Sequence, residues 1–369
     1  MTIIGGGIVG CATAAAVASP DRTVVLLEKR ERLAAGTTSR NSEVAHGGMY
    51  YPPGSRKARW CVAGRRRLKA FCAEAGVGWR DVGKLIVAAD PAGEPELARL
   101  LARGRENGVE GLRLVGRDEL HRLEPAVRGT AALFSPATAV FDAEGAARAL
   151  ARRAADAGAQ VLTGAEVVGL APAAGGWDVT VRRGRETWTH RSRRVVNAAG
   201  LDADSVAALA GLDPDAAGLR QHWVRGSYVT VNPRHAGRLR HLVYPVPDPA
   251  VDTLGVHVCL DLAGQVRLGP DYEPLAARVE DYRVPADRAA AFFAAAAPLL
   301  PFLAPDDLSP AFAGIRPKLG VTGFHDFVVR RETGDLAGLI NLAGIDSPGL
   351  TSSPAIAAEV ARLLDEEDA

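Results

Sequence analysis

Three glycines near the start of the chain have the spacing of a phosphate-binding turn. Gly5, Gly7 and Gly10 fit the pattern GxGxxG between a short apolar strand and a helix expected over residues 11–19. The first glycine allows a tight turn, the second makes room for a pyrophosphate, and the third lets the helix pack closely on the strand. Glu28 ends the next apolar run, residues 23–28, where an acidic side chain can hold ribose hydroxyls. The spacing predicts a dinucleotide site without a 2′-phosphate, and it does not separate NAD from FAD.

The far end of the chain favours a flavin. Residues 339–342 read as a buried strand, residues 344–349 as a turn, and residues 351–364 as a final helix. The N-terminus of this helix would bring the positive end of a second helix dipole toward the nucleotide. A nicotinamide cofactor does not need that charge, whereas a flavin that is reduced to an anion does. We therefore predict FAD.

Between these two ends, α/β patterns give way to antiparallel strands. Apolar spacing predicts helices over 55–75, 94–107, 118–123, 145–157 and 287–300. Short apolar runs predict strands over 84–88, 160–162, 166–170, 177–182, 186–190 and 194–200, followed by antiparallel strands over 227–231, 242–246, 255–261 and 265–269. In residues 255–261, His257 shares one face with Cys259 and Asp261, while apolar residues occupy the other. A sheet with one polar face can carry a substrate site.

These patterns predict an α/β protein in which a Rossmann-like FAD-binding domain is interleaved with a mixed antiparallel-sheet substrate domain. We assign residues 1–80, 141–220 and 311–369 to the discontinuous FAD-binding domain. Residues 81–140 and 221–310 are assigned to the substrate-binding domain.

Composition narrows the class of protein. The 369 residues are 47% hydrophobic and carry a net charge of +1, which is typical of a globular protein and gives no reason to expect a nucleic-acid partner. The four cysteines lack metal-binding spacing, so we predict reduced thiols, no metal and a cytoplasmic location. We also predict no transmembrane segment.

Five segments of the chain together resemble a known flavoprotein superfamily. They are the Gly5–Gly10 turn, residues 36–48, residues 195–200, residues 314–317 and residues 347–353. They are similar to the FAD-dependent D-amino-acid oxidase and glycerol-3-phosphate dehydrogenase superfamily. Residues 41–46, 50–55, 255–257 and 268–270 are most similar to its L-2-hydroxyglutarate dehydrogenase/oxidase branch.

The resemblance implies a glutathione-reductase-like FAD fold and a set of cofactor-binding residues. Besides the three glycines and Glu28, these are Lys29, Thr38, Ser39, Arg40, Asn41, Ser42, Val167, Ala199, Gly200, Gly344, Ser347, Gly349, Leu350 and Thr351. Because no cysteine lies in these segments, we predict that the flavin is bound non-covalently.

The resemblance also implies oxidation of a carbon that bears a hydroxyl or an amine beside a carboxylate. Such chemistry needs a cation for the carboxylate and a base for the proton. Arg316 is the predicted anchor, because a guanidinium matches a carboxylate with two hydrogen bonds, and Lys318 is a candidate to assist it. His46 and His257 are the candidate bases, each expected to titrate near neutral pH.

Three further residues are candidates for the substrate site. Tyr244 and Tyr50 are candidate hydrogen-bond donors to the substrate. Arg225 stands where the resemblance implies a lysine before Gly226, and we include it because arginine and lysine are not equivalent in a buried site.

Three functions stay open from the sequence. The first is a 2-hydroxy-acid dehydrogenase or oxidase acting on a small carboxylate such as L-2-hydroxyglutarate. The second is an amine or amino-acid oxidase on the same fold, and the third is a flavin-binding redox subunit that needs a partner. Oxygen, a quinone and a redox protein are all candidate electron acceptors.

Overall fold

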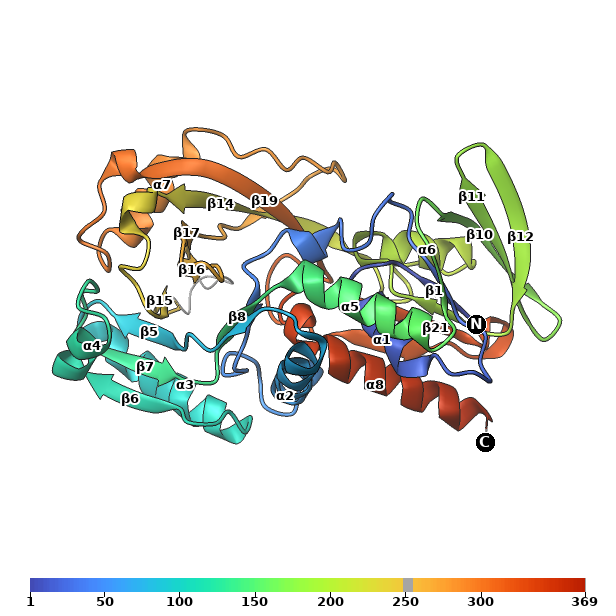
Figure 1. Cartoon of the computed structure of the whole chain (residues 1–369), viewed down its shortest axis with the longest axis horizontal. Coiled ribbons are helices and arrows are strands. Elements are labelled where there is room, and N and C mark those ends of the chain that lie inside the picture. Colours follow the sequence, from blue (N-terminus) through green and yellow to red (C-terminus); the bar gives the residue numbers. More distant parts are fainter. Residues whose placement is uncertain (248–254, 369) are drawn as a thin grey trace.

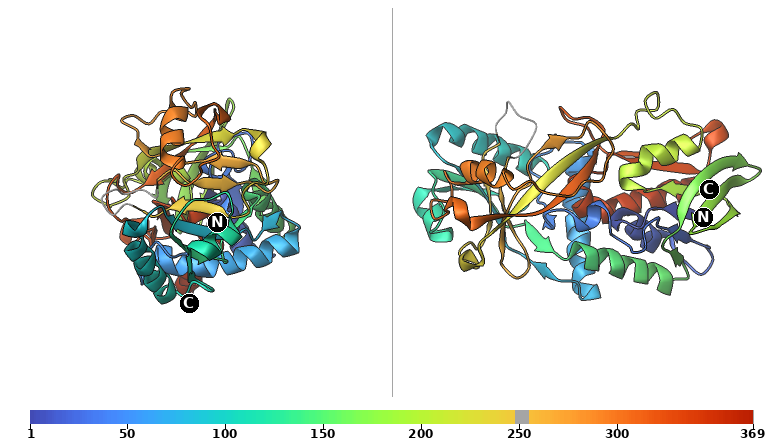
Figure 2. Two further views of the ribbon diagram at one scale, coloured as in Figure 1. Left: turned by 90° about the vertical axis from the view of Figure 1, so that its left-hand side faces the viewer. Right: turned by 90° about the horizontal axis from the view of Figure 1, so that it is seen from above.

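The computed structural model describes residues 1–247 and 255–368. The molecule is elongated, with a parallel sheet and its helices at one end and smaller sheets at the other (Figure 1). Both termini lie at the end that carries the parallel sheet, and the view from above agrees (Figure 2). Among the described residues, no helix combines the length and apolar character needed to cross a bilayer.

A six-stranded sheet forms the frame of the nucleotide region. Its strand order is β20-β21-β13-β1-β2-β9, with β20 antiparallel at one edge and the other strands parallel. The strands are β1 (Thr2–Ile4), β2 (Val25–Leu27), β9 (Gln160–Leu162), β13 (Val195–Asn197), β20 (Val328–Arg331) and β21 (Leu339–Ala343). Because β1 lies between β2 and β13 and is parallel to both, the carboxyl ends of the three strands meet at one edge. A doubly wound sheet binds its ligand at this edge.

The two faces of this sheet are covered differently. Ile3, Leu26 and Val196 share one core with α1 (Ile8–Val17), α5 (Ala143–Asp156) and α8 (Gly349–Asp368). Ile4 and Leu27 point the other way and pack on Trp177 of an antiparallel sheet made of β10 (Glu166–Ala173), β11 (Gly176–Arg183) and β12 (Glu186–Ser192). Successive residues of a strand face opposite sides, so each short apolar strand supplies both cores. α6 (Ala203–Leu209) follows β13 on this second side.

The other end of the molecule contains two more sheets around one large core. One has the order β16-β17-β14-β18 with β19 paired to β14, and the other has the order β15-β5-β7-β6. The first consists of β14 (His222–Val231), β16 (Val258–Leu260), β17 (Val266–Leu268), β18 (Glu273–Pro274) and β19 (Leu308–Lys318). The second consists of β5 (Lys84–Ala88), β6 (Arg113–Gly116), β7 (Ala131–Ser135) and β15 (Leu242–Pro245).

The remaining elements surround and join these sheets. A small sheet of β3 (Val44–Ala45), β8 (Ala139–Phe141) and β4 (Trp79–Arg80) runs between the two ends. The helices are α2 (Arg56–Ala75), α3 (Glu94–Glu106), α4 (Arg117–Leu123) and α7 (Arg288–Ala296). The α2 helix begins at Ser55, whose hydroxyl accepts from Ala58 N–H, and ends at Gly76 with φ +66°. The helix therefore lies within one residue of the predicted range 55–75, with a side-chain cap at its start and a left-handed glycine at its end.

The predicted fold class is confirmed, and three details are wrong. Residues 242–245 pair in parallel with β5 instead of joining the antiparallel sheet, because a strand's partner is not visible in its own apolar pattern. The strand expected over 255–261 covers only Val258–Leu260, and Cys259 of its expected polar face is fully buried. The α7 helix ends at Ala296, before the predicted residue 300. The domain boundaries stay a prediction, although β19 places residues 311–318 in the sheet of β14.

Candidate functional site

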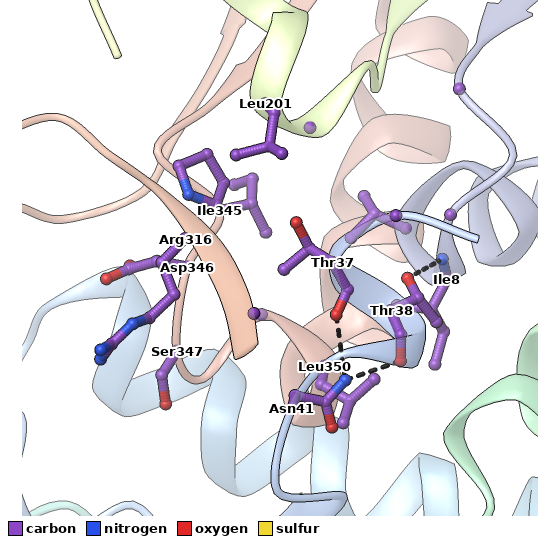
Figure 3. A pocket seen from close by; sticks show the side chains of 18 of the residues that line it. Ile8, Thr37, Thr38, Asn41, Leu201, Arg316, Ile345, Asp346, Ser347 and Leu350 are labelled. Atoms are coloured by element: carbon purple, nitrogen blue, oxygen red, sulfur yellow. Dashed lines mark hydrogen bonds between the residues drawn. The ribbon is translucent and has the colours of Figure 1, made fainter. Parts of the chain in front are cut away.

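A cavity of about 730 Å³ runs from the carboxyl edge of the parallel sheet to the sheet of β14 and β19. It is lined both by the glycine-rich turn and by the candidate catalytic residues His46, His257 and Arg316. In Figure 3, Arg316, Asp346 and Ser347 lie on the left, apart from Ile8 and Thr38 on the right. The cavity therefore joins the predicted nucleotide site to the predicted substrate site.

The glycine-rich turn leaves space that a side chain would fill. Gly5 has φ +109°, and a Cβ there would lie 2.3 Å from the carbonyl oxygen of Ala198. A Cβ on Gly10 would lie 1.9 Å from the carbonyl oxygen of Gly5, so this glycine permits helix and strand to touch and does not itself line the cavity. Gly7 does line it, and the N-terminus of α1 has no side-chain cap from its N-cap residue. This geometry suits a pyrophosphate at the helix end.

Glu28 lies at the end of β2 and is held in place by the backbone. One carboxylate oxygen accepts from Gly6 N–H at 2.7 Å and the other from Arg30 N–H at 2.8 Å. The carboxylate lines the cavity beside Val167, where it can accept hydrogen bonds from ribose hydroxyls. Lys29 also lines the cavity, but its amine is 2.7 Å from a carboxylate oxygen of Asp202.

The loop after β2 is fixed by its own side chains (Figure 3). Thr38 Oγ1 accepts from Ile8 N–H at 3.0 Å, and Asn41 Nδ2 donates to the carbonyl oxygens of Thr37 and Thr38. Thr37 Oγ1 donates to Ile315 on β19, which ties the loop to the second sheet. Thr38, Arg40, Asn41 and Ser42 line the cavity, whereas Ser39 does not; its hydroxyl donates to Gly36.

The last helix begins at the cavity, as its sequence predicts. Ser347, Gly349 and Leu350 line the cavity, together with Ala199 and Gly200 after β13. Gly344 and Thr351 do not line it. Gly344 donates its N–H to Gln221, and Thr351 Oγ1 accepts the N–H of His46 at 3.1 Å. Thr351 therefore supports the loop that carries a candidate base.

Arg316 presents its guanidinium to the cavity from β19. One terminal nitrogen donates to the carbonyl oxygen of Asp271 at 2.8 Å, and the guanidinium carbon is 5.5 Å from the ring centre of Tyr272. A Cβ on Gly226 of β14 would lie 2.9 Å from the same guanidinium, so this glycine makes room for it. Because Arg316 forms no ion pair within the described residues, the cation is available to an anionic ligand.

The two histidines are held in different ways. Nδ1 of His257 is 2.9 Å from the carbonyl oxygen of Gly255. A carbonyl only accepts, so Nδ1 carries the proton and Nε2 is the acceptor of the neutral ring. Burial lowers the pKa of His257 to about 3. Burial and the neighbouring Lys84 lower the pKa of His46 well below its ordinary value. The expectation that either residue titrates near neutral pH is therefore wrong.

Lys318 and Tyr50 line the cavity, but Arg225 and Tyr244 do not. Lys318 is 3.4 Å from a carboxylate oxygen of Asp346. Arg225 is paired with Glu273 at 2.9 Å, so its charge is already matched. Tyr244 is fully buried and stacks on His257, with ring centres 3.7 Å apart.

Sequence reasoning missed Lys84 and Lys57. Lys84 is fully buried on β5, with its amine 3.5 Å from Nδ1 of His46 and 3.8 Å from the ring centre of Tyr244. Lys57 lines the cavity and pairs with Asp346 at 2.5 Å. Lys84 is the first residue of the strand KLIVA, where a lysine resembles a charged residue at an exposed strand end, so its burial could not be predicted from the local pattern. Lys57 lies in a helix rich in basic residues and gave no such indication.

The cavity therefore fits FAD: a cradle at Gly7, an acidic residue at the ribose position and two helix N-termini border one continuous space. A family model described as "FAD dependent oxidoreductase" matches residues 1–363. The chain belongs to this family. As a member it is an FAD-dependent oxidoreductase, and the prediction of FAD over NAD is confirmed.

Two relatives illustrate the branch. The chain is 36% identical over 402 residues to an L-2-hydroxyglutarate dehydrogenase, named as mitochondrial, from Arabidopsis thaliana, covering 97% of this chain and 82% of the relative. It is 36% identical over 283 residues to an L-2-hydroxyglutarate dehydrogenase of Escherichia coli K12, covering 76% of this chain and 65% of the relative. The predicted resemblance to this branch is confirmed.

Solved structures agree on the fold. The FAD-bound, dithionite-reduced L-alpha-glycerophosphate oxidase of Mycoplasma pneumoniae superimposes with a TM-score of 0.87 at 29% identity, covering 99% of this chain and 94% of that chain. Glycine oxidase of Geobacillus kaustophilus superimposes with a TM-score of 0.82 at 22% identity, covering 99% and 94%. At 22% identity, the similarity to glycine oxidase supports the fold alone.

Proposed function

We propose that the protein oxidises a small 2-hydroxy acid, such as L-2-hydroxyglutarate, to the 2-oxo acid. The observation that carries this proposal is Arg316, a guanidinium facing the same cavity as the nucleotide cradle. Bound FAD supplies the acceptor for the hydride that leaves the carbon bearing the hydroxyl. The relatives from Arabidopsis thaliana and Escherichia coli are both named L-2-hydroxyglutarate dehydrogenase, and L-2-hydroxyglutarate is a 2-hydroxy acid.

Arg316 orients the substrate by its carboxylate. Asp271 holds one side of the guanidinium, and the remaining N–H groups can donate two parallel hydrogen bonds to a carboxylate. Lys318, two residues along the same strand, lies on the same face of β19. Lys318 and Lys57 share the single carboxylate of Asp346, so the cluster keeps one positive charge for an anionic substrate. We propose that these cations select acids over neutral alcohols.

His46 or His257 receives the hydroxyl proton. Both line the cavity, and both are neutral at physiological pH because burial disfavours their charged forms. Tyr50 borders the same space, and its buried hydroxyl has no partner among the described residues. It is therefore a proposed donor to the substrate.

Two other functions have less support. An amine or amino-acid oxidase can use this fold, but the glycine oxidase structure is only 22% identical and supports no more than the fold. A redox subunit without turnover of its own would not need a cavity with an arginine open to an anion. We also propose a cytoplasmic location and an electron acceptor among oxygen, a quinone and a redox protein.

An anaerobic screen tests the proposal. The purified holoenzyme is mixed with L- and D-2-hydroxyglutarate, L-lactate, L-glutamate and the corresponding neutral alcohols, and loss of the oxidised flavin absorbance is followed. We expect bleaching by one enantiomer of a 2-hydroxy acid and none by the neutral alcohols. Bleaching by L-glutamate alone would instead establish the amino-acid oxidase. Reoxidation by air, a quinone or an artificial dye then identifies the class of acceptor.

Two variants separate substrate binding from folding. Arg316→Met removes the proposed anchor, whereas Arg330→Met removes a guanidinium from an ion pair with Glu332 at 2.9 Å that lies outside the cavity. We expect Arg316→Met to bind FAD and to lose bleaching, and Arg330→Met to keep both. If the two variants behave alike, Arg316 is not the anchor.

A further inference from the structure

Lys84 is an amine enclosed without a counter-charge. It lies on β5 and is fully buried, and within the described residues it forms no ion pair. Its amine lies over the ring of Tyr244, 3.8 Å from the ring centre, and 5.2 Å from that of Tyr50. Nδ1 of His46 lies 3.5 Å from the amine. A charged group in such a place is expensive, which points to a use for the neutral amine.

The contact between Lys84 and His46 has two forms. An ammonium can only donate, so it would donate to Nδ1 and leave the ring proton of neutral His46 on Nε2. A neutral amine has a lone pair and can accept from Nδ1–H, which leaves Nε2 free as an acceptor. Nε2 faces Ser347 Oγ at 3.5 Å at the edge of the cavity. Only the neutral form of Lys84 thus allows Nε2 of His46 to accept a proton from the cavity.

We propose that Lys84 is a positioning residue that, in its neutral form, accepts a hydrogen bond from His46 Nδ1–H and so makes Nε2 of His46 the proton acceptor for the substrate. This inference rests on the proposed 2-hydroxy-acid oxidation and names His46 as its base. Lys84 does not line the cavity, so it acts through His46.

The proton has a complete path in this arrangement. The substrate O–H bond breaks and its proton binds Nε2 of His46, while Nδ1 gives its proton to the lone pair of Lys84. The electron pair of the O–H bond forms the second bond of the carbonyl. The hydrogen of the neighbouring C–H bond, with its electron pair, is the hydride that bound FAD would accept. His46 ends neutral with its proton on Nε2, and Lys84 ends as an ammonium.

His257 lacks such a path. Its Nδ1–H donates to the carbonyl oxygen of Gly255, which cannot take up a proton at neutral pH. A proton placed on Nε2 would therefore stay on a buried imidazole whose pKa is about 3. The ring of Tyr244 contacts both His257 and Lys84, at 3.7 and 3.8 Å from its centre. Two groups at such distances need opposite faces of the ring, so Tyr244 separates Lys84 from His257.

Lys84 titrates near neutral pH, whereas the groups around it do not. Burial lowers the pKa of Lys84 to about 7. The thiols that face it, Cys61 of α2 and Cys259 of β16, have pKa values raised by burial to about 12. Burial also raises the pKa of Tyr50 and of Tyr244. These four groups therefore stay neutral between pH 6 and 9.

Two arginines and two histidines complete the surroundings of Lys84. Arg65 lies near Cys61, and Arg316 near His257; both keep their charge throughout this range. His46 and His257 have pKa values lowered by burial and stay neutral in it. A pH effect between 6 and 9 in this cluster thus reports Lys84.

The kinetic test is anaerobic stopped-flow reduction of the holoenzyme from pH 5.5 to 9.5. With L-2-hydroxyglutarate as substrate, the wild-type rate constant should rise with pH to a plateau, with a midpoint near 7. Lys84→Met has no basic amine to take up the proton from Nδ1, and Lys84→Arg is always charged. Both variants should therefore lose the rise and reduce the plateau roughly a hundredfold. The dissociation constant of the substrate, which Arg316 anchors, should change less than about threefold in both variants. Lys69→Met, at an exposed lysine paired with Asp81, is the matched control and should keep the wild-type profile.

A double variant tests whether Lys84 acts through His46. In the His46→Asn background, Lys84→Met should cause no further loss, because the residue it positions is already gone. A full additional loss, or a Lys84→Met profile with the wild-type rise, would overturn the proposal. A merely structural role would lower the rate of both Lys84 variants and leave the rise in place.

A second readout does not depend on turnover. In the oxidised holoenzyme labelled with ¹⁵N-histidine, the His46 tautomer should change from Nε2–H below pH 7 to Nδ1–H above it, and Lys84→Met should abolish the change. The same tautomer on both sides of pH 7 in the wild type would overturn the proposal. If 2-hydroxy acids do not reduce the enzyme but the tautomer changes, the proposed function fails while the Lys84–His46 contact stands.

Discussion

Replacing the buried amine with a thioether should stabilise the protein, and by an amount that depends on pH. Lys84→Met keeps a similar length of side chain in a site that is fully enclosed. In the folded wild-type protein, burial lowers the pKa of Lys84 from an ordinary 10.5 to about 7. The folded state therefore favours the neutral amine, and the unfolded chain binds more protons between these two pH values.

The sign and size follow from this difference. The buried amine therefore lowers the free energy of unfolding of the wild type by its full amount below pH 7. This penalty decreases as pH rises toward 10.5. At about 1.36 kcal/mol for each pH unit, the penalty amounts to about 5 kcal/mol at pH 6 and about 2 kcal/mol at pH 9. Lys84→Met escapes this penalty, so its advantage over the wild type should shrink by about 3 kcal/mol between pH 6 and pH 9. Apolar burial of the thioether adds a contribution that does not depend on pH.

Urea unfolding of both proteins with saturating FAD, at pH 6, 7, 8 and 9, measures this trend. The slope of each transition must match between variants, so that a change in midpoint reports a change in stability. Lys69→Met is again the control, because its amine is exposed and should give a difference that is nearly flat with pH. A flat difference for Lys84→Met as well would show that Lys84 is not held neutral, and would refute the reasoning about His46.

Three other outcomes are expected. Gly7→Val should abolish FAD binding, seen as loss of the yellow absorbance after desalting, because its side chain would fill the cradle beside Thr38; a yellow variant would place the pyrophosphate elsewhere. Acid precipitation should release the flavin into the supernatant, and flavin retained in the pellet would mean a covalent bond. Arg316→Met should lower kcat/KM about 10²–10⁴-fold, because loss of one partner of a desolvated ion pair costs about 3–5 kcal/mol. Arg316→Lys should recover part of this loss, and a wild-type kcat/KM in Arg316→Met would exclude the anchor.

Local patterns in the sequence were enough for the nucleotide half. Gly5, Gly7, Gly10 and Glu28 lie within one strand-helix-strand unit, where spacing along the chain fixes spacing in the fold. The structure brings all but Gly10 to the cavity, and Gly10 instead lets the helix touch the turn. The positions of the helices and strands in this half follow from residues a few places apart, although α1 begins at Ile8, three residues before the predicted start.

The substrate half depends on pairings between distant segments. Nothing within residues 242–245 indicates a parallel partner at residues 84–87. That pairing encloses Lys84, which in sequence resembles a charged residue at the exposed end of a strand. Arg225 illustrates the reverse error, because its carboxylate partner Glu273 comes from a strand of only two residues that no periodicity identifies.

The parallel contact between β5 and β15 also has a consequence for the order of folding. The two strands join residues 84–87 to residues 242–245, so this part of the sheet has a high contact order and its loop-closure entropy must be overcome late. Until β15 docks, Tyr244 cannot cover Lys84, and the amine stays hydrated and charged. Docking therefore expels a proton at neutral pH, and we expect the rate of the last folding step to rise with pH while the steps that form the parallel sheet do not change.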